Sequence, residues 1–196
     1  MERTRLRRKP QRGSHERSVI DEILDEALVC HVALPGPVVL PTTFVRMDDH
    51  IYLHGAATNG MLSRLSEGLD VCVAVTLLDA LVLAKTALHH SVNYRSVVIF
   101  GRGELVTDPA RKQASLGALL DKVVPNRSRE CRMANDKELA ATQIIALSLE
   151  EASAKIRKGP PLEEDGADAE LPYWAGLIPL VTMRGEPISA STSKNV

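Results

Sequence analysis

The spacing of apolar residues along this chain of 196 residues changes several times, and each change marks a predicted element. Helical spacing recurs over residues 15–27, near residues 60–68, and after Asp108-Pro109, where the aspartate caps a helix that the proline begins. Between these helices the apolar runs are short and β-branched, which predicts strands over residues 28–34, 38–46, 51–54, 71–78, 81–85, 97–106, 141–149 and 152–157. Closely spaced strands joined by hairpin turns, one of them at Asp79-Ala80, favour an antiparallel barrel with helices packed outside.

Two places along this pattern differ from ordinary strands and turns. Pro41 lies inside the strand predicted over residues 38–46, and because proline has no N–H it indicates an edge, a bulge or a break there. The segment Gly55–Leu62 passes from a strand into a helix, and free N–H groups at a helix start suit a phosphate. The segment lacks the lysine-serine pair of a Walker motif, so as a motif it is weak.

The stretch Leu88–Gly101 places polar side chains directly before a β-branched, apolar strand. Within it, Arg95 offers a planar charged fork and Ser96 a hydroxyl donor, a combination that suits a phosphate. The alternative is a polar loop in which Arg95 pairs with a surface carboxylate. The sequence leaves both interpretations open.

Composition and charge narrow the class of protein. With 44% hydrophobic residues the chain can bury a core, and we expect a single domain over residues 14–182 between flexible tails over residues 1–13 and 183–196. A formal net charge of -1 argues against nucleic acid as the main partner. The arginines and lysines crowded into the first dozen residues are typical of a solvated tail, with a nucleic-acid arm or a membrane-surface tag as alternatives.

The sequence predicts neither a membrane span nor a metal site. No apolar run reaches the roughly 18 residues that a span requires, and the basic N-terminus is not followed by the apolar segment of a secretory signal. Cys30, Cys72 and Cys131 are odd in number and form no CxxC pair, so we expect a reducing, cytoplasmic setting. His89 and His90 are adjacent and would point to opposite sides of an extended chain, so they do not form one metal-binding face.

Four segments, taken in chain order, carry a family pattern: Ile51–Ala56, Asp79–Lys85, His89–Val97 and Pro172–Gly176. Together they resemble the pyridoxamine 5'-phosphate oxidase-like flavoproteins, and most of all the flavin-nucleotide-binding branch related to nitroimidazole-resistance proteins. The last segment is similar to the Trp-x-Gly turn of that superfamily. The resemblance implies an antiparallel split β-barrel with flanking helices, forming a homodimer that binds FMN in the cleft between its subunits.

The resemblance also implies which residues bind FMN. The segment around Thr42 would run along the edge of the isoalloxazine ring, the segment His54–Arg64 would hold the ribityl-phosphate tail, and the segment Asn93–Ser96 would add further contacts. The implied cofactor-binding residues are Pro41, Thr42, Thr43, His54, Gly55, Ala56, Asn59, Met61, Leu62, Arg64, Asn93, Tyr94, Arg95, Ser96 and Trp174.

The function expected from this resemblance is hydride transfer between FMN and a small-molecule substrate. No Ser-His-Asp or Cys-His arrangement is visible, so no catalytic residue is assigned. Pyridoxamine phosphate oxidases end with an Arg-Leu-His segment, whereas this chain reads Val-Thr-Met-Arg-Gly-Glu from Val181, which argues against that activity. The alternatives are a flavin carrier or sensor without turnover, and a split-barrel protein that binds haem or a deazaflavin.

Overall fold

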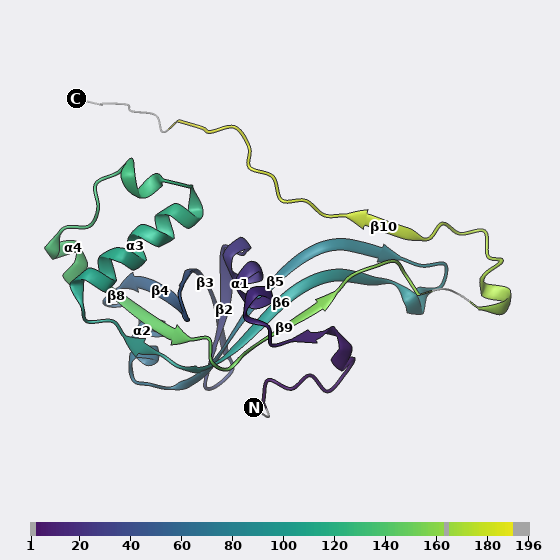
Figure 1. Cartoon of the computed structure of the whole chain (residues 1–196), viewed down its shortest axis with the longest axis horizontal. Helices are drawn as coiled ribbons and strands as arrows, with labels where there is room; N and C mark the ends of the chain where they lie inside the picture. The colour runs from purple at the N-terminus through teal and green to yellow at the C-terminus, as the bar shows by residue number, and fades with distance from the viewer. Residues whose placement is uncertain (1–2, 163–164, 190–196) are drawn as a thin grey trace. The chain divides into compact units, whose positions relative to one another are not determined.

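The computed structural model describes residues 3–162 and 165–189, and within them the chain forms ten strands and four α-helices (Figure 1). The strands are β1 (Gly13–Ser14), β2 (Val29–Leu34), β3 (Val38–Met47), β4 (His50–Ala56), β5 (Asp70–Leu83), β6 (Ser91–Arg102), β7 (Glu104–Leu105), β8 (Thr142–Ser148), β9 (Ala152–Arg157) and β10 (Gly176–Pro179). The α-helices are α1 (Arg17–Glu26), α2 (Gly60–Ser66), α3 (Pro109–Val123) and α4 (Asp136–Ala140). Short 3₁₀ helices are η1 (Pro10–Arg12), η2 (Ala87–His89), η3 (Arg127–Arg129) and η4 (Gly166–Asp168).

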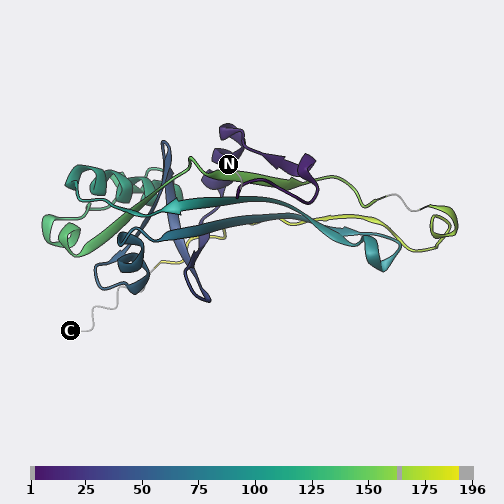
Figure 2. The ribbon, with the colours of Figure 1, turned by 90° about the horizontal axis from the view of Figure 1, so that it is seen from below.

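The strands form one sheet in the order β1-β9-β6-β5-β2-β3-β4-β8-β7, with β10 added to β5. The neighbours β5 and β6 are its longest strands, with 14 and 12 residues (Figure 2). The apolar stripe of α1, with Ile23 and Leu24, packs with Phe44, Leu62 and other fully buried side chains in the main core. The predicted mainly β, antiparallel fold with flanking helices is therefore confirmed.

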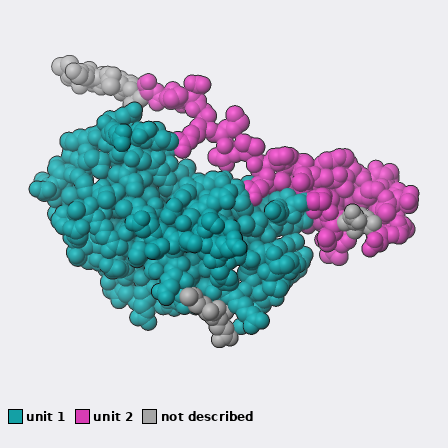
Figure 3. All heavy atoms as spheres, viewed as in Figure 1, with its two compact units in different colours: residues 1–78, 93–159 teal, residues 79–92, 160–196 magenta. Residues whose placement is uncertain are grey.

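The chain forms two compact units (Figure 3). The first comprises residues up to 78 and residues 93–159, and it contains the main core. The second comprises residues 79–92 and the chain from residue 160 onward, with the end of β5, η2, η4 and β10. The single domain expected over residues 14–182 stays a prediction.

The turn predicted at Asp79-Ala80 is wrong, because β5 runs unbroken through both residues. Neither residue is glycine or proline, so nothing in the pair forces the chain to reverse. Ala80 is buried and pairs with Pro179 of β10, while the Asp79 carbonyl accepts a hydrogen bond from the amide of Leu180 at 2.9 Å. The single charged residue that interrupted the apolar pattern therefore sits within a strand.

The basic N-terminal segment, expected to be a flexible tail, is tied to the sheet along residues 3–14. The Arg3 guanidinium donates to the carboxylates of Asp70, at 2.6 Å, and Glu151, and it lies over the ring of Phe100. Further along, β1 pairs with β9. The acidic and aromatic partners lie far away in the sequence, so the run of positive charge alone indicated a solvated tail.

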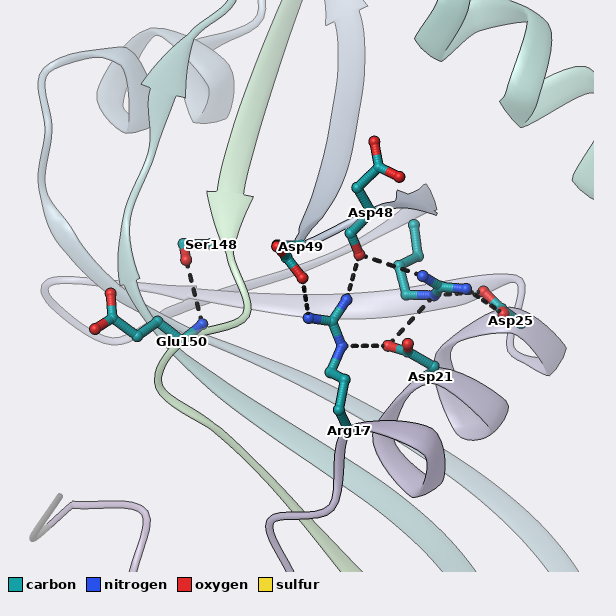
Figure 4. A network of polar contacts seen from close by, with 8 residues as sticks. Arg17, Asp21, Asp25, Asp48, Asp49, Ser148 and Glu150 are labelled. Atoms are coloured by element: carbon teal, nitrogen blue, oxygen red, sulfur yellow. Dashed lines mark hydrogen bonds and ion pairs between the residues drawn. The ribbon is translucent and has the colours of Figure 1, made fainter.

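Two arginines fasten the β3–β4 hairpin to α1 (Figure 4). Arg17, at the start of α1, donates to the Asp49 carboxylate and to the backbone carbonyl of Asp48. Arg46 of β3 donates twice to the Asp25 carboxylate, at 2.6 and 2.8 Å. Exposed ion pairs contribute little singly, but this set fixes the orientation of the hairpin that carries the site described below.

Gly103, between β6 and β7, provides a test of this packing. An added Cβ at Gly103 would lie 2.8 Å from the Leu65 carbonyl oxygen and 2.8 Å from Ile145 Cγ2. We expect Gly103→Ala to lower the free energy of unfolding by about 1–3 kcal/mol, as overpacking does, in urea denaturation monitored by circular dichroism. Gly60→Ala is the control, because no atom lies within 4 Å of its added Cβ. Equal stability of the two variants would contradict the packing described.

Candidate flavin site

Strands β3 and β4 separate at the pair Phe44 and Leu53. Beyond this pair, β4 continues to Ala56 alongside β8, whereas residues 38–43 of β3 pair with β2 alone among the described strands. Backbone groups on the free side of that segment have no strand partner, so they are open to a ligand. Pro41 lies in the middle of the open segment, which explains how a strand interior accommodates a residue without an N–H.

A hollow of about 380 Å³ lies at this separation. Its lining comes from β3 and from the start of α2, and consists of Leu40, Pro41, Thr42, Asn59, Gly60 and Met61. Four of these residues were predicted from the sequence, in two separate segments, and the structure brings them to one place. Leu40 and Gly60 were missing from the predicted set, although each is the sequence neighbour of a residue in it.

The turn before α2 is held by a side-chain cap. Asn59 Oδ1 accepts hydrogen bonds from the amides of Met61, at 3.0 Å, and Leu62, at 3.1 Å. These two amides are therefore engaged, which differs from the expectation that the helix start presents free N–H groups to a phosphate. Gly55 lies close to this turn, since an added Cβ would be 2.9 Å from Leu62 Cδ1. Leu62 is fully buried, so it and Gly55 position the turn by packing.

His54 is the first β4 residue beyond the last β3–β4 pair. The side chain is half-buried, and its Nδ1 is buried without a hydrogen-bond partner among the described residues. Burial lowers the pKa of this imidazole, so the ring is neutral near pH 7. A buried nitrogen without a partner is costly, and a polar group of a ligand beside β4 would satisfy it. Ala56, at the end of the same strand, pairs with Thr142.

The segment Asn93–Ser96 makes its polar contacts within the chain. Asn93 is 5% exposed, donates to the Gly159 carbonyl at 3.1 Å and accepts from Arg157. Ser96 Oγ donates to the Lys155 carbonyl at 3.2 Å. Tyr94 is half-buried on the same strand and pairs with Arg157. These contacts fasten β6 to β9, and the part of the segment in cofactor binding stays a prediction.

The two arginines predicted to contact the phosphate also have protein partners. The Arg95 guanidinium donates to both oxygens of the Glu26 carboxylate, at 2.5 and 2.9 Å. This arrangement is the alternative interpretation left open by the sequence. Arg64 donates to the Pro35 carbonyl at 2.9 Å. No cationic side chain is among the residues that line the hollow.

Trp174 belongs to the second unit and is 63% exposed. Its indole lies over Gly176, where an added Cβ would be only 2.6 Å from Trp174 Cζ2. This contact explains the Trp-x-Gly pattern, because any larger residue would displace the ring. A role for Trp174 beside the flavin stays a prediction.

Within residues 3–162 and 165–189, no three histidine, cysteine or carboxylate side chains cluster as metal ligands. Across the same residues, no helix combines the length and apolar character needed to cross a bilayer. Cys30 is buried and Cys72 and Cys131 are half-buried, and all three are free thiols.

Comparison with known proteins gives a consistent result. The family described as pyridoxamine 5'-phosphate oxidase matches residues 16–156. No curated protein matches the chain. The solved structure of the flavocytochrome Anf3 from Azotobacter vinelandii is 34% identical, with a TM-score of 0.91 over 100% of this chain and 92% of that one. The structure of the FAD and heme binding protein from Mycobacterium smegmatis is 35% identical, with a TM-score of 0.86 over 92% of this chain and 90% of that one.

A third structure, a putative 5-nitroimidazole antibiotic resistance protein from Bacteroides thetaiotaomicron, is 19% identical, with a TM-score of 0.62 over 74% of this chain and 86% of that one. At 19% identity, this match indicates the fold alone. The three matches agree with the expected split barrel, and the separation of β3 from β4 is where this barrel opens.

The buried imidazole of His54 predicts a pH dependence of stability. In the unfolded chain a histidine has a pKa of about 6.5 and binds a proton below that pH. In the folded protein the pKa of His54 is lowered, so its imidazole binds that proton less readily. The free energy of unfolding should therefore fall as the pH drops below about 6.5, and His54→Gln should flatten that fall, measured by urea denaturation between about pH 7.5 and 5. His50→Gln is the control, and a His54→Gln curve parallel to that of the native protein would contradict the assignment.

Proposed function

Because the chain belongs to the pyridoxamine 5'-phosphate oxidase family, we propose that it is a flavin-binding redox protein with its flavin at the hollow between β3 and α2. One observation carries this proposal: two segments chosen from the sequence as flavin-binding line the same hollow. The unpartnered Nδ1 of His54, on β4 where it leaves β3, supports the proposal as well. A bound flavin would supply hydride transfer, and the protein would supply orientation and electrostatics.

We propose FAD as the flavin, in place of the FMN that the family resemblance implies. The names of two relatives at 34% and 35% identity speak of a flavocytochrome and of FAD and heme binding. Charge supports the same choice. The terminal phosphate of FMN would carry nearly two negative charges at pH 7, and the lining of the hollow has no cation to offset them. In FAD the two phosphates form a diphosphate in which each carries one negative charge, and the adenosine extends the ligand beyond the hollow.

Three lining residues, and His54 on the neighbouring strand β4, have defined parts in this proposal. Pro41 and Thr42 lie on the open side of β3, where backbone oxygens can meet the polar edge of the flavin ring. The neutral His54 can donate or accept one hydrogen bond without adding charge beside the ring. Asn59 holds the turn that forms the opposite wall. These groups would orient a flavin. No proton transfer is assigned to any of them, so the catalytic residue stays unassigned.

We propose that the protein is a homodimer whose partner subunit closes this hollow. The central part of the outward face of β2, β3 and β5 supports the proposal because it has no charged residue; Asp70, at the start of β5, lies at the edge of this face and pairs with Arg3. The register places His31 opposite Pro41 and Ala74, and Ala33 opposite Val39 and Cys72. The side chains of this central part are Val29, His31, Ala33, Val39, Pro41, Thr43, Cys72, Ala74 and Thr76. With Val39 60% and Val29 45% exposed, such a face is typical of a subunit contact.

The reaction that we propose is oxidation or reduction of a small molecule by hydride transfer. A carrier or sensor without turnover is the alternative, and steady-state oxidation of NADH and NADPH with a range of acceptors separates the two.

We further propose haem as a second bound group. The names of both relatives support it.

Blocking the hollow tests the flavin site. Gly60 has room for a side chain and lines the hollow, so Gly60→Leu should fill part of it without disturbing the fold. We expect the native protein to retain FAD after desalting and Gly60→Leu to bind it on the order of tenfold more weakly, by absorbance and fluorescence titration. Gly60→Ala is the matched control. Titrations with FMN and with a deazaflavin identify which flavin binds.

The double variant Arg95→Ala, Ser96→Ala separates this site from the phosphate contact first inferred from sequence. Both side chains have protein partners, so the variant should keep FAD while losing the ion pair with Glu26. Loss of flavin from the double variant together with retention by Gly60→Leu would move the site to β6 and overturn the hollow as its location.

A charge placed on the uncharged face tests the dimer. We expect the native protein to be a dimer by light scattering at micromolar concentration and Val39→Arg to shift it to monomer, because a buried unpaired charge is costly. The control is Val123→Arg, which adds the same charge to an apolar position, 44% exposed, at the end of α3. A monomeric native protein, or equal effects of the two variants, would contradict the proposed interface.

A further inference from the structure

We propose that a second hollow, beside the start of α1, binds a small organic phosphate. The hollow has a volume of about 480 Å³ and lies within the first unit. Four parts of the chain line it: the N-terminal segment, the first turn of α1, the turn after β8 and the start of β9. The inference concerns a site apart from the flavin hollow and does not rest on the proposed function.

Arg5 lines this hollow, and its neighbours in the chain fix its backbone there. Arg3 is held by two carboxylates and an aromatic ring, and Thr4, which also lines the hollow, is only 3% exposed. Leu6 lies so close to Gly13 that a side chain at that glycine would not fit. The Arg5 side chain itself is exposed and forms no hydrogen bond or ion pair within the part of the chain that the structure describes. Its guanidinium is therefore a cation that is positioned by the fold and available to a ligand.

The charge of the whole N-terminal segment favours an anion at this place. Residues 3–12 carry six cationic side chains and no acidic one. Among the described residues, Arg3 alone of these six has carboxylate partners. Because the segment is tied to the sheet, its charge stays on one part of the folded surface and attracts anions there. The flavin hollow, by contrast, has no cation in its lining.

The first turn of α1 adds hydrogen-bond donors to the same place. His15, Arg17 and Ile20 all line the hollow, and α1 begins at Arg17. No side chain caps this helix, and no acidic residue lies in its first turn. The N–H groups of that turn therefore have no acceptor within the helix, and the partial positive charge of the helix start is not offset. His15 is exposed, and its imidazole can donate a hydrogen bond whether or not it is protonated. A phosphate suits such a set of convergent donors.

Two further charged residues in the lining change this balance little. Arg17 is paired with Asp21 and Asp49, and Figure 4 shows its guanidinium directed toward these carboxylates, so its charge is largely offset. Glu150 is the one acidic residue in the lining, and it is exposed, so solvent and salt screen its repulsion of an anion. Binding of an anion therefore depends mainly on the guanidinium, the imidazole and the helix start described above.

The apolar part of the lining indicates an organic phosphate in preference to the free ion. Ile20, Leu149 and Ala152 line the hollow and are 2%, 5% and 5% exposed. The volume lies within the range of small-molecule sites, roughly 300–1,000 Å³. A phosphate ion alone would leave these apolar side chains uncovered. A ligand that carries an apolar or aromatic group beyond its phosphate would contact them and the donors together.

The test is a calorimetric titration of the full chain with phenyl phosphate, and in parallel with inorganic phosphate, at constant ionic strength. We expect phenyl phosphate to bind roughly threefold or more tightly than inorganic phosphate, because its ring covers the apolar lining. Arg5→Gln and His15→Ala should each weaken binding on the order of fivefold to tenfold, since each removes a donor to a charged group. Glu150→Gln should strengthen binding by removing a like charge.

Arg8→Gln is the matched control. It removes the same charge from the same segment, and Arg8 is exposed and does not line the hollow. Arg7 is unsuitable for this purpose, because it lines a neighbouring hollow together with Arg5. We expect Arg8→Gln to titrate like the native protein. Gly60→Leu, which fills part of the flavin hollow, should also bind phenyl phosphate like the native protein.

Three outcomes would overturn the inference. Equal weakening by Arg5→Gln and Arg8→Gln would show attraction by the overall charge of the segment, without a defined site. Loss of phenyl phosphate binding in Gly60→Leu with retention in Arg5→Gln would place the phosphate in the flavin hollow. Absence of binding to the native protein would also contradict the proposal. The flavin titration of Gly60→Leu is measured separately, so the proposed function stands or falls on its own result.

Discussion

The separation of β3 from β4 is the feature on which the proposed site depends. The two strands pair for only four residues from the hairpin. Beyond that point β4 pairs with β8 alone, and β3 pairs with β2 alone, among the described strands. A sheet that closes on itself leaves no backbone group for a ligand, whereas this opening leaves one side of β3 unpaired. The arginines that fasten the hairpin to α1 fix where the opening begins, because they hold the only part of β3 that pairs with β4.

Around this opening the chain uses neutral groups. A proline, a threonine, a capping asparagine and a neutral imidazole surround the hollow or adjoin it, and the nearby arginines are engaged with Glu26 and with a backbone carbonyl. A neutral site binds through shape and through single hydrogen bonds, so it favours a ligand whose charge lies elsewhere along its length. The proposed choice of FAD and the proposed contact with a second subunit therefore rest on the same property, which is the lack of charged side chains at this place.

How far the sequence predicts this structure depends on the range of each interaction. Pro41 and Asn59 were recognisable because each acts on its own backbone neighbourhood, through a missing donor and through a helix cap. The partner of Arg95 was not recognisable, because Glu26 lies 69 residues away and any of many carboxylates could have filled that place. The same limit explains the N-terminal segment, whose positive charge predicted a free tail until Asp70 and Glu151 were seen beside Arg3.

The cap at Asn59 has a consequence for the chemical ageing of the protein. It is followed by Gly60, and an asparagine before glycine is the pair in which the next backbone nitrogen most readily attacks the side-chain amide. Conversion of Asn59 to aspartate keeps an oxygen to accept from Met61 and Leu62, so the turn persists. It also places a full negative charge on the wall of a hollow that has no cation. Stored protein would thus keep its fold while losing its hold on an anionic ligand, and peptide mass spectrometry alongside a binding titration would reveal whether the two changes advance together.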